Sequence, residues 1–318
     1  MQQEKNSGAP SSAFGRIWMK VPLVVRSILT GFVVTSIGVG IWVLLVKNIP
    51  EPWSVVPMGA ILIPYWIYFS GRWNPSRTRA FRRFCTRQIR LKRSVWIWGL
   101  LAALIIVLVV NSVGILTFRI YEFQPETFKT ARFLNELPAW KAWPVILMAS
   151  LVAGICEETG YRGYMQVPLE KKYGPVAGIS ITSLVFALAH IHQAWAGGML
   201  GMIVIFVISI MIGYLAYSTG SLLPGIIAHT SFDIINFSYW WSDVVGTFER
   251  KPISMTGVDN HFIITLTVVL LSFILFIVSI RKLLKLKMED SQLQTINIKS
   301  FWKNHFLNRN TFGRLNDK

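Results

Sequence analysis

Long apolar runs recur along the whole chain and are separated by shorter polar segments. The hydrocarbon core of a bilayer is about 30 Å thick and needs about 20 apolar residues per helix. Each run therefore predicts one membrane-spanning helix. The runs lie at residues 27–46, 53–71, 95–117, 143–165, 174–191, 196–217, 221–241 and 262–280. The pattern predicts an all-α fold, a polytopic integral membrane helical bundle with about eight transmembrane helices.

Composition agrees with a membrane protein. Hydrophobic residues make up 53% of the 318 residues and charged residues 15%, whereas a soluble domain carries about 25% charged residues. The charged residues gather between the apolar runs instead of spreading along the chain. An ordinary soluble enzyme is therefore excluded.

The positions of Lys and Arg predict the topology. If the N-terminus is cytoplasmic, the cytoplasmic segments hold 24 of the 32 Lys and Arg residues, and the opposite side holds seven. The positive-inside rule demands this asymmetry, and eight spans return the C-terminus to the cytoplasm. The expected organisation is a cytoplasmic tail at 1–26, three helices within 27–141 with a basic cytoplasmic loop at 72–94, a four-helix core at 142–245, an external loop and an eighth helix at 246–280, and a basic cytoplasmic tail at 281–318.

The net charge of +17 also suggests a nucleic-acid-binding protein. The basic loop 72–94, however, contains no acidic residue and interleaves its cations with Phe81 and Phe84, and the C-terminal tail carries Phe301 and Trp302. Basic segments with aromatic residues bind anionic lipid at a membrane surface. We therefore expect anionic lipid at this loop and at the C-terminal tail, and no nucleic acid as a partner.

Ionisable residues enter the interiors of only three of the apolar runs, the fourth, fifth and seventh. Only thirteen residues, Pro144 to Cys156, lie between Trp143 at the start of the run and Glu157, so a helix that crosses the bilayer must carry Glu157. A charge at the centre of such a helix costs about 2.5–3.5 kcal/mol, and intramembrane charges usually mark a functional site. The groups must pair or neutralise inside the bundle. They are Glu157, Glu158, Arg162, His190, His229 and Asp233.

Helical spacing indicates which of these side chains share a helix face. Glu158 and Arg162 are four residues apart and share a helix face, as do His229 and Asp233. Glu157 is turned about 100° from Glu158 and can face a different neighbour. A carboxylate, two imidazoles and an acidic partner around one polar cavity can activate a water molecule.

Three motifs on successive polar-bearing spans carry a family resemblance. The chain contains EExxxR at 157–162, FxxxH at 186–190 and the HxxxN/D element at 229–233, in that order. With these motifs the segment at about 140–245 resembles the CAAX-protease and bacteriocin-processing (CPBP, or Abi) family, whose best-known branch is the type II CAAX prenyl endopeptidase. The residues concerned are Glu157, Glu158, Arg162, Phe186, His190, His229 and Asp233.

The resemblance implies an intramembrane endopeptidase that cleaves a membrane-associated, in some branches lipidated, peptide or protein. It implies a multi-pass protein in the plasma membrane of a prokaryote, with the active site open toward the cytoplasm. Glu157, aided by His190, would activate the attacking water, and His229 with Asp233 would orient the water or stabilise the oxyanion. The supporting residues would be Glu158, Arg162 and Phe186.

One position departs from the prenyl endopeptidases, which typically have Asn where this chain has Asp233. An ionised Asp cannot donate a hydrogen bond to an oxyanion. It can hold His229 in one tautomer or contribute to a metal site. The family has been described both as glutamate-dependent and as metal-dependent. A Zn²⁺ site formed by Glu157, His190, His229 and Asp233 therefore stays an open alternative.

Two other classes of function stay open beside the endopeptidase. A non-catalytic membrane scaffold or bacteriocin-immunity-type protein would carry the same motifs without turnover. A proton-coupled transporter also uses buried Glu and His residues, although transporters usually show broken helices or inverted repeats. The chain contains no HExxH, GxGD or rhomboid-like GxSG motif, which excludes other kinds of intramembrane protease.

Overall fold

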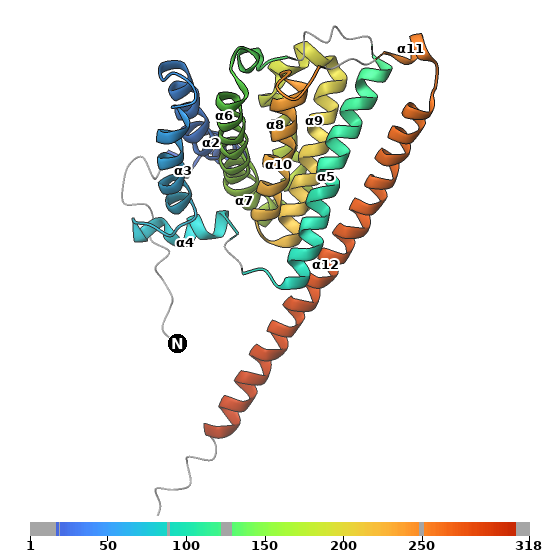
Figure 1. Cartoon of the computed structure of the whole chain (residues 1–318). Helices are drawn as coiled ribbons and strands as arrows, with labels where there is room; N and C mark the ends of the chain where they lie inside the picture. The colour runs from blue at the N-terminus through green and yellow to red at the C-terminus, as the bar shows by residue number, and fades with distance from the viewer. Residues whose placement is uncertain (1–16, 19, 88–89, 122–128, 248–250, 310–318) are drawn as a thin grey trace, which may run out of the picture.

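The computed structural model describes residues 17–18, 20–87, 90–121, 129–247 and 251–309, and within these ranges only the backbone of 192–200 and 290–309. Every regular element in these ranges is a helix (Figure 1). The helices are α2 (Leu23–Asn48), α3 (Val55–Phe69), α4 (Ser76–Cys85), α5 (Arg93–Ile120), η2 (Arg132–Glu136), α6 (Ala139–Val152), η3 (Ala153–Met165), α7 (Gln166–Tyr173), α8 (Pro175–Ala189), α9 (Ile191–Thr219), α10 (Leu223–Ile235), η4 (Asn236–Trp240), α11 (Ile253–Thr256) and α12 (Asn260–Arg309).

All eight predicted spans coincide with helices, and the all-α polytopic architecture is confirmed. Within the described ranges, five helices are long and apolar enough to cross a bilayer: Leu23–Asn48, Arg93–Ile120, Ala139–Tyr173, Gly201–Thr219 and Asn260–Glu289. The other three predicted spans correspond to shorter helices, namely α3, α8 and α10 with its extension η4. The exact number of eight spans stays a prediction.

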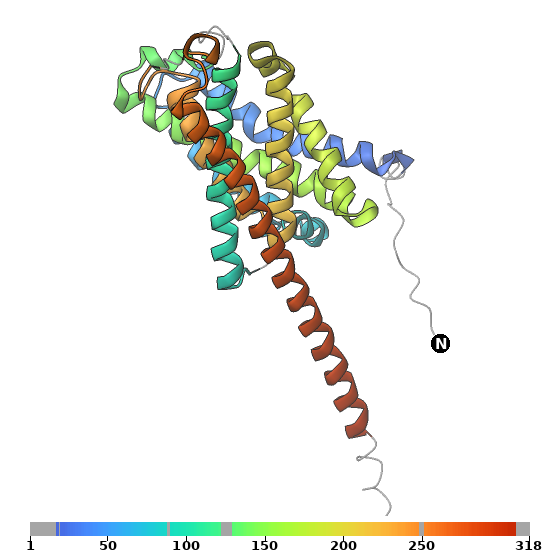
Figure 2. The ribbon, with the colours of Figure 1, turned by 90° about the vertical axis from the view of Figure 1, so that its right-hand side faces the viewer.

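Helix α12 continues well past the predicted end of the eighth span at residue 280. Its 50 residues run without a break to Arg309. Figure 1 and Figure 2 show α12 following α5 and then projecting beyond the rest of the bundle. Much of the segment expected as a basic tail, 281–318, is therefore an extension of the last helix.

Two glycines end the helices that flank the candidate site. Gly174 has φ +87° and follows α7, and Gly220 has φ +65° and follows α9. Glycine reaches positive φ without the steric cost of a side chain, so it is the usual residue at these positions. Pro175 and Pro224 then lie in the first turns of α8 and α10, where a missing N–H costs nothing.

The fourth predicted span differs most from its prediction. The expected helix 143–165 and the residues that follow it, 166–173, form one continuous helical unit, Ala139–Tyr173. Its middle part, η3, is a 13-residue π-helix. A π-helix has i→i+5 hydrogen bonds and usually occurs as a single turn, often at functional sites.

Helix α2 packs closely against η3. A Cβ added to Gly160 would lie 2.0 Å from Thr35 Oγ1 and 2.6 Å from the carbonyl oxygen of Gly31, and one added to Gly38 would lie 2.2 Å from Cys156 Sγ. Small residues on both helices thus permit backbone contact, as is common inside membranes. The contact fixes η3 against the N-terminal part of the bundle.

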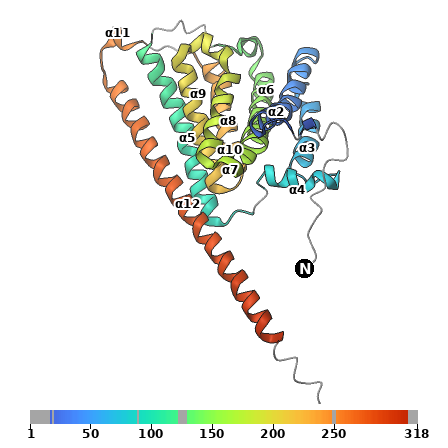
Figure 3. The same cartoon turned by 180° about the vertical axis from the view of Figure 1, so that it is seen from behind.

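The two ends of the bundle differ. Helix α4, from the basic loop, lies across the end of the bundle toward which α12 projects, and α11 lies at the opposite end (Figure 1). The view from behind shows the same arrangement (Figure 3). The two most basic segments of the chain therefore lie at one end, as the predicted topology requires.

Candidate active site

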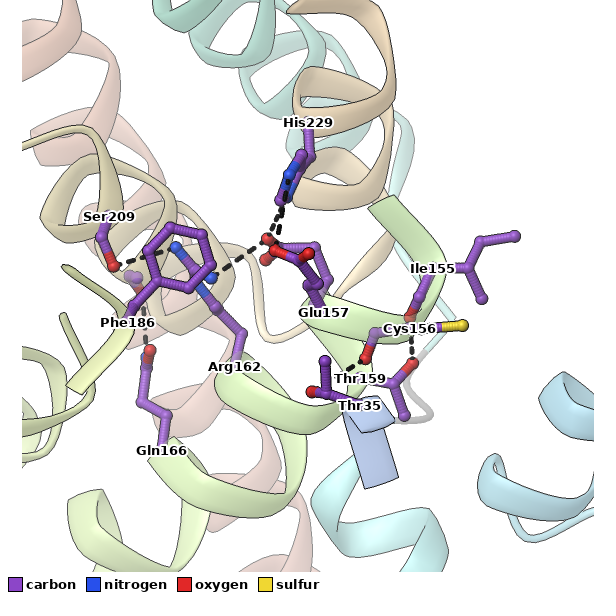
Figure 4. Close-up of polar contacts among 12 residues, drawn as sticks. Thr35, Ile155, Cys156, Glu157, Thr159, Arg162, Gln166, Phe186, Ser209 and His229 are labelled. Atoms are coloured by element: carbon purple, nitrogen blue, oxygen red, sulfur yellow. Dashed lines mark hydrogen bonds and ion pairs between the residues drawn. The ribbon is translucent and has the colours of Figure 1, made fainter. Parts of the chain in front are cut away.

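The structure brings the predicted polar residues together from three segments of the chain. Glu157 belongs to η3, His190 lies at the junction of α8 and α9, and His229 belongs to α10. Glu157 Oε2 lies 4.0 Å from His190 Nε2 and 3.9 Å from His229 Nε2. The convergence expected from the sequence is therefore present, and Figure 4 shows Glu157 and His229 side by side.

His229 lies against two consecutive glutamates. Its Nδ1 is 2.8 Å from Glu158 Oε1, and its Nε2 is 3.9 Å from Glu157 Oε2. An α-helix turns successive residues about 100° apart, whereas the i→i+5 bonding of η3 gives more residues per turn and a smaller angle. The expectation that Glu157 faces a different neighbour is therefore met only in part, because Glu157 reaches His190 but also shares His229 with Glu158.

Hydrogen bonds orient both imidazoles in the same way. His190 Nδ1 lies 2.8 Å from the carbonyl oxygen of Phe186. A carbonyl oxygen can only accept, so Nδ1 donates, and Nε2 is the nitrogen that faces Glu157. In His229, Nδ1 faces the Glu158 carboxylate and Nε2 again faces Glu157. The nitrogen turned toward Glu157 is thus set by the bond that the other nitrogen makes.

Asp233 also approaches the imidazole that shares its helix face. Its Oδ2 lies 3.5 Å from His229 Nε2, and its Oδ1 accepts a hydrogen bond of 3.3 Å from Asn236 Nδ2. Both His229 and Asp233 are buried. The predicted face of α10 is therefore confirmed, and Asp233 lies next to His229.

Arg162 contacts several of the other predicted site residues. Its fully buried guanidinium pairs through Nη1 with Glu158 Oε1 at 3.2 Å and donates through Nη2 to Ser209 Oγ at 3.0 Å (Figure 4). The Phe186 ring lies 4.4 Å from Arg162 Cζ and 4.4 Å from the His190 ring. The predicted ion pair between Glu158 and Arg162 is confirmed, and Phe186 packs between the cation and an imidazole.

Sequence reasoning missed two parts of this arrangement. Ser209 lies in the middle of α9, and Glu158 bonds directly to His229. No motif singles out Ser209, because a lone serine in an apolar helix usually bonds to its own backbone. The bond from Glu158 to His229 depends on how η3 faces α10, which spacing along the sequence does not reveal.

The expected zinc ligands are Glu157, His190, His229 and Asp233. Across the residues that the structure describes, no group of three or more His, Cys, Asp or Glu side chains is arranged to hold a metal ion. The residues do not fit such a site as they stand, so no step below passes through a metal. The zinc expectation stays a prediction.

Comparison with protein families gives one match. Residues 139–235 match the family described as Type II CAAX prenyl endopeptidase Rce1-like. This segment belongs to the Rce1-like family. The Rce1-like segment runs from the start of α6 to the end of α10 and contains all seven residues of the three motifs. The resemblance drawn from the sequence is thereby confirmed.

The match concerns residues 139–235, about a third of the chain. At the family level it supports a CAAX-type intramembrane endopeptidase, and the apolar helices support an integral membrane protein. Comparison with curated proteins found no match, and comparison with solved structures found none.

Proposed function

We propose that this protein hydrolyses a peptide bond of a membrane-associated peptide or protein, lipidated substrates included, and that Glu157 and His190 activate the attacking water. One observation carries the proposal: two imidazole Nε2 atoms lie within 4.0 Å of the same carboxylate oxygen, Glu157 Oε2. That oxygen is buried and accepts no hydrogen bond from any described residue.

These distances suit a shared water molecule better than direct bonds. Hydrogen bonds between N–H and oxygen measure 2.7–3.2 Å, so 3.9 and 4.0 Å are too long for direct contact. A water between the three atoms can bond to each of them, and polar contacts beyond 3.5 Å are commonly bridged in this way. Glu157 then lies within reach of a water proton, which a general base requires.

The hydrolysis follows from these positions. The water oxygen bonds to the carbonyl carbon while one water proton passes to Glu157, with His190 orienting the water. His229 Nε2 also faces Glu157. When this nitrogen carries a proton, it can donate a hydrogen bond to the oxyanion. Collapse of the tetrahedral intermediate breaks the C–N bond, and the proton on Glu157 passes to the leaving amine.

Asp233 acts through His229 in this scheme. A carboxylate cannot donate to an oxyanion, but Asp233 lies 3.5 Å from His229 Nε2 and can position the imidazole. Glu158 fixes the other side of the ring, and Arg162 neutralises Glu158. Asp233, Glu158 and Arg162 are therefore positioning residues. Metal analysis of the purified protein, with activity measured in a chelator, decides whether zinc takes part.

The proposal includes an orientation. Both termini, the basic loop and the opening of the site face the cytoplasm of a prokaryotic cell, which is supported by the 24 of 32 Lys and Arg residues on that side. A peptide substrate anchored near the cytoplasmic face would then approach the site from the basic end of the bundle.

The test compares Glu157→Gln and His190→Ala with the wild-type chain. Loss of a general base costs about 10²–10⁴-fold in rate, so we expect substrate processing to fall by at least about 100-fold while abundance in the membrane stays normal. The readout is the set of peptide termini found by proteomics in a deletion strain complemented with each variant.

The matched control is Cys156→Ala. Cys156 precedes Glu157, but its sulfur faces Gly38 of α2 instead of the histidines. This variant should process substrate normally. Full biological activity in both Glu157→Gln and His190→Ala would favour a non-catalytic scaffold, and uptake into liposomes driven by an ion gradient would favour a transporter.

A further inference from the structure

A polar cavity separate from the candidate active site lies where the end of α3, the segment after α4 and the start of α10 meet. Its volume is about 300 Å³, at the lower end of the range for small-molecule sites. No acidic side chain is among the described residues that line it. Its polar lining consists of Arg72, Arg87, Arg90, Thr86 and Ser221, with Trp66 beside them.

Arg87 is held in the wall of this cavity at a conformational cost. It has φ +50°, the left-handed region in which glycine is usual after a helix, and such a residue costs about 1–3 kcal/mol. Its side chain is 9% exposed, and Nη2 pairs with Glu170 Oε2 at 2.7 Å. Its buried Nε has no hydrogen-bond partner among the described residues. Arg87 thus retains a donor after its ion pair is made.

The start of α10 adds further groups that attract an anion. Ser221, Leu222 and Leu223 border the cavity, and the N-terminus of a helix carries a partial positive charge. Ser221 Oγ accepts a hydrogen bond from the backbone N–H of Leu223, so its own proton is left to donate. Arg72 and Arg90 are exposed at the same cavity. A phosphate would meet several charge-assisted donors there.

The surroundings identify the source of the phosphate. Trp73, Phe81 and Phe84 are exposed on the same basic segment, and α4 lies across the basic end of the bundle (Figure 1). Exposed aromatic residues of this kind lie at the level of the lipid headgroups. Basic pockets between membrane helices bind acidic headgroups. A phospholipid in the bilayer is therefore the phosphate compound nearest to the cavity.

We propose that this cavity binds the phosphate group of one anionic phospholipid. The sequence predicted lipid contact over the whole loop 72–94. The proposed site is a single defined location, formed by Arg72, Arg87 and Arg90 together with the start of α10. His229 follows Leu222 by seven residues, or about 10 Å along the helix. A bound lipid would therefore hold the first turn of the helix that carries His229.

The experiment uses the full chain, purified in a neutral detergent and stripped of lipid. Dioleoyl phosphatidylglycerol, dioleoyl phosphatidylcholine and inorganic phosphate are added separately, and binding is measured by native mass spectrometry and by thermal unfolding. We expect one phosphatidylglycerol per chain. Arg90→Gln should weaken its binding about tenfold, the effect of losing one strong charge-assisted hydrogen bond.

The matched control is Arg77→Gln, which removes the same charge from α4 at an exposed position outside the cavity. It should weaken binding less than about twofold, since screened surface charges contribute little. An equal loss in both variants, or no loss in Arg90→Gln, would overturn the site. Equal protection by inorganic phosphate and by phosphatidylglycerol would overturn the lipid assignment.

This result does not depend on the proposed peptidase activity. Binding is read without turnover, so Glu157→Gln should bind phosphatidylglycerol like the wild-type chain. A chain that binds the lipid but processes no substrate would contradict only the peptidase proposal. A chain that processes substrate but shows no site-specific lipid binding would contradict only this inference.

Discussion

Arg162 is the residue on which the positions of the other charged side chains depend. It is fully buried, and it contacts Glu158, Ser209 and the Phe186 ring at once. Glu158 in turn holds His229 Nδ1. A buried ion pair adds little net stability, but removing one partner leaves the other as an uncompensated buried charge. The pair therefore matters most for the geometry that it fixes.

Replacing Arg162 should destabilise the fold more than it should alter the chemistry directly. We expect Arg162→Ala to lower the free energy of unfolding by about 3–5 kcal/mol, because Glu158 would stay buried without its cation. Thermal unfolding in micelles and abundance in membranes measure the effect. Ser209→Ala removes one hydrogen bond and should cost about 1 kcal/mol. If Arg162→Ala were as stable as Ser209→Ala, the ion pair would not hold the site.

At this scale the sequence predicted which residues meet but not every bond between them. The motif spacing predicted the pairs Glu158 with Arg162 and His229 with Asp233, because residues four apart on a helix are neighbours. It did not predict the bond between Glu158 and His229, since these residues lie on different helices. Such a bond depends on the rotation of one helix relative to another.

The element that shapes the site is η3. It places two consecutive glutamates within reach of one imidazole, and its small residues allow α2 to pack against its backbone. The apolar runs predicted the helices of the eight expected spans, because any membrane span must satisfy its backbone hydrogen bonds internally. They did not predict α4, which lies in the segment expected as the basic loop 72–94. They did not predict the π-helix, since α and π windings of one sequence have the same apolar content.

Enlarging a glycine at this contact tests the role of α2. In Gly160→Ala the new Cβ would lie 2.6 Å from the backbone oxygen of Gly31, so α2 or η3 must move. Overpacking of this kind costs about 1–3 kcal/mol, and we expect a lower unfolding temperature together with reduced processing.

Gly40→Ala is the matched control on α2, because nothing lies within 4 Å of its added Cβ. Alanine is favoured over glycine in a helix by about 1 kcal/mol, so this variant should be as stable as the wild type or more stable. Equal stability of Gly160→Ala and Gly40→Ala would show that the close contact between α2 and η3 is not required.

For the whole molecule, the charge distribution and the fold both distinguish a basic end of the bundle from an opposite end. Helix α4 and the projecting part of α12 lie at one end, and α11 lies at the other (Figures 1 and 3). Charge counting predicted that the basic loop and the C-terminal segment share a side. It did not predict that α12 continues to Arg309, because a hydrophobicity pattern ends where apolar residues end, whereas a helix needs only backbone hydrogen bonds.

Single added cysteines can establish which end faces the cytoplasm. Ser76 at the start of α4 is exposed, and Met255 in α11 is 71% exposed at the other end. Background labelling should be low, because Cys85 and Cys156 are both buried. Burial also raises the pKa of Cys85 to about 12, so very little of it is the reactive thiolate at neutral pH.

With a membrane-impermeant maleimide, Met255→Cys should be labelled in intact cells, and Ser76→Cys should be labelled only after the membrane is permeabilised. This outcome follows from the positive-inside rule, since nine Lys and Arg residues lie in 72–94 and nine more in 281–318. The polar cavity lined by Arg72, Arg87 and Arg90 would then lie at the cytoplasmic leaflet, where anionic lipids attract basic segments. The reverse labelling pattern would place α4 and its cavity outside the cell, and a substrate would have to reach Glu157 from the external face.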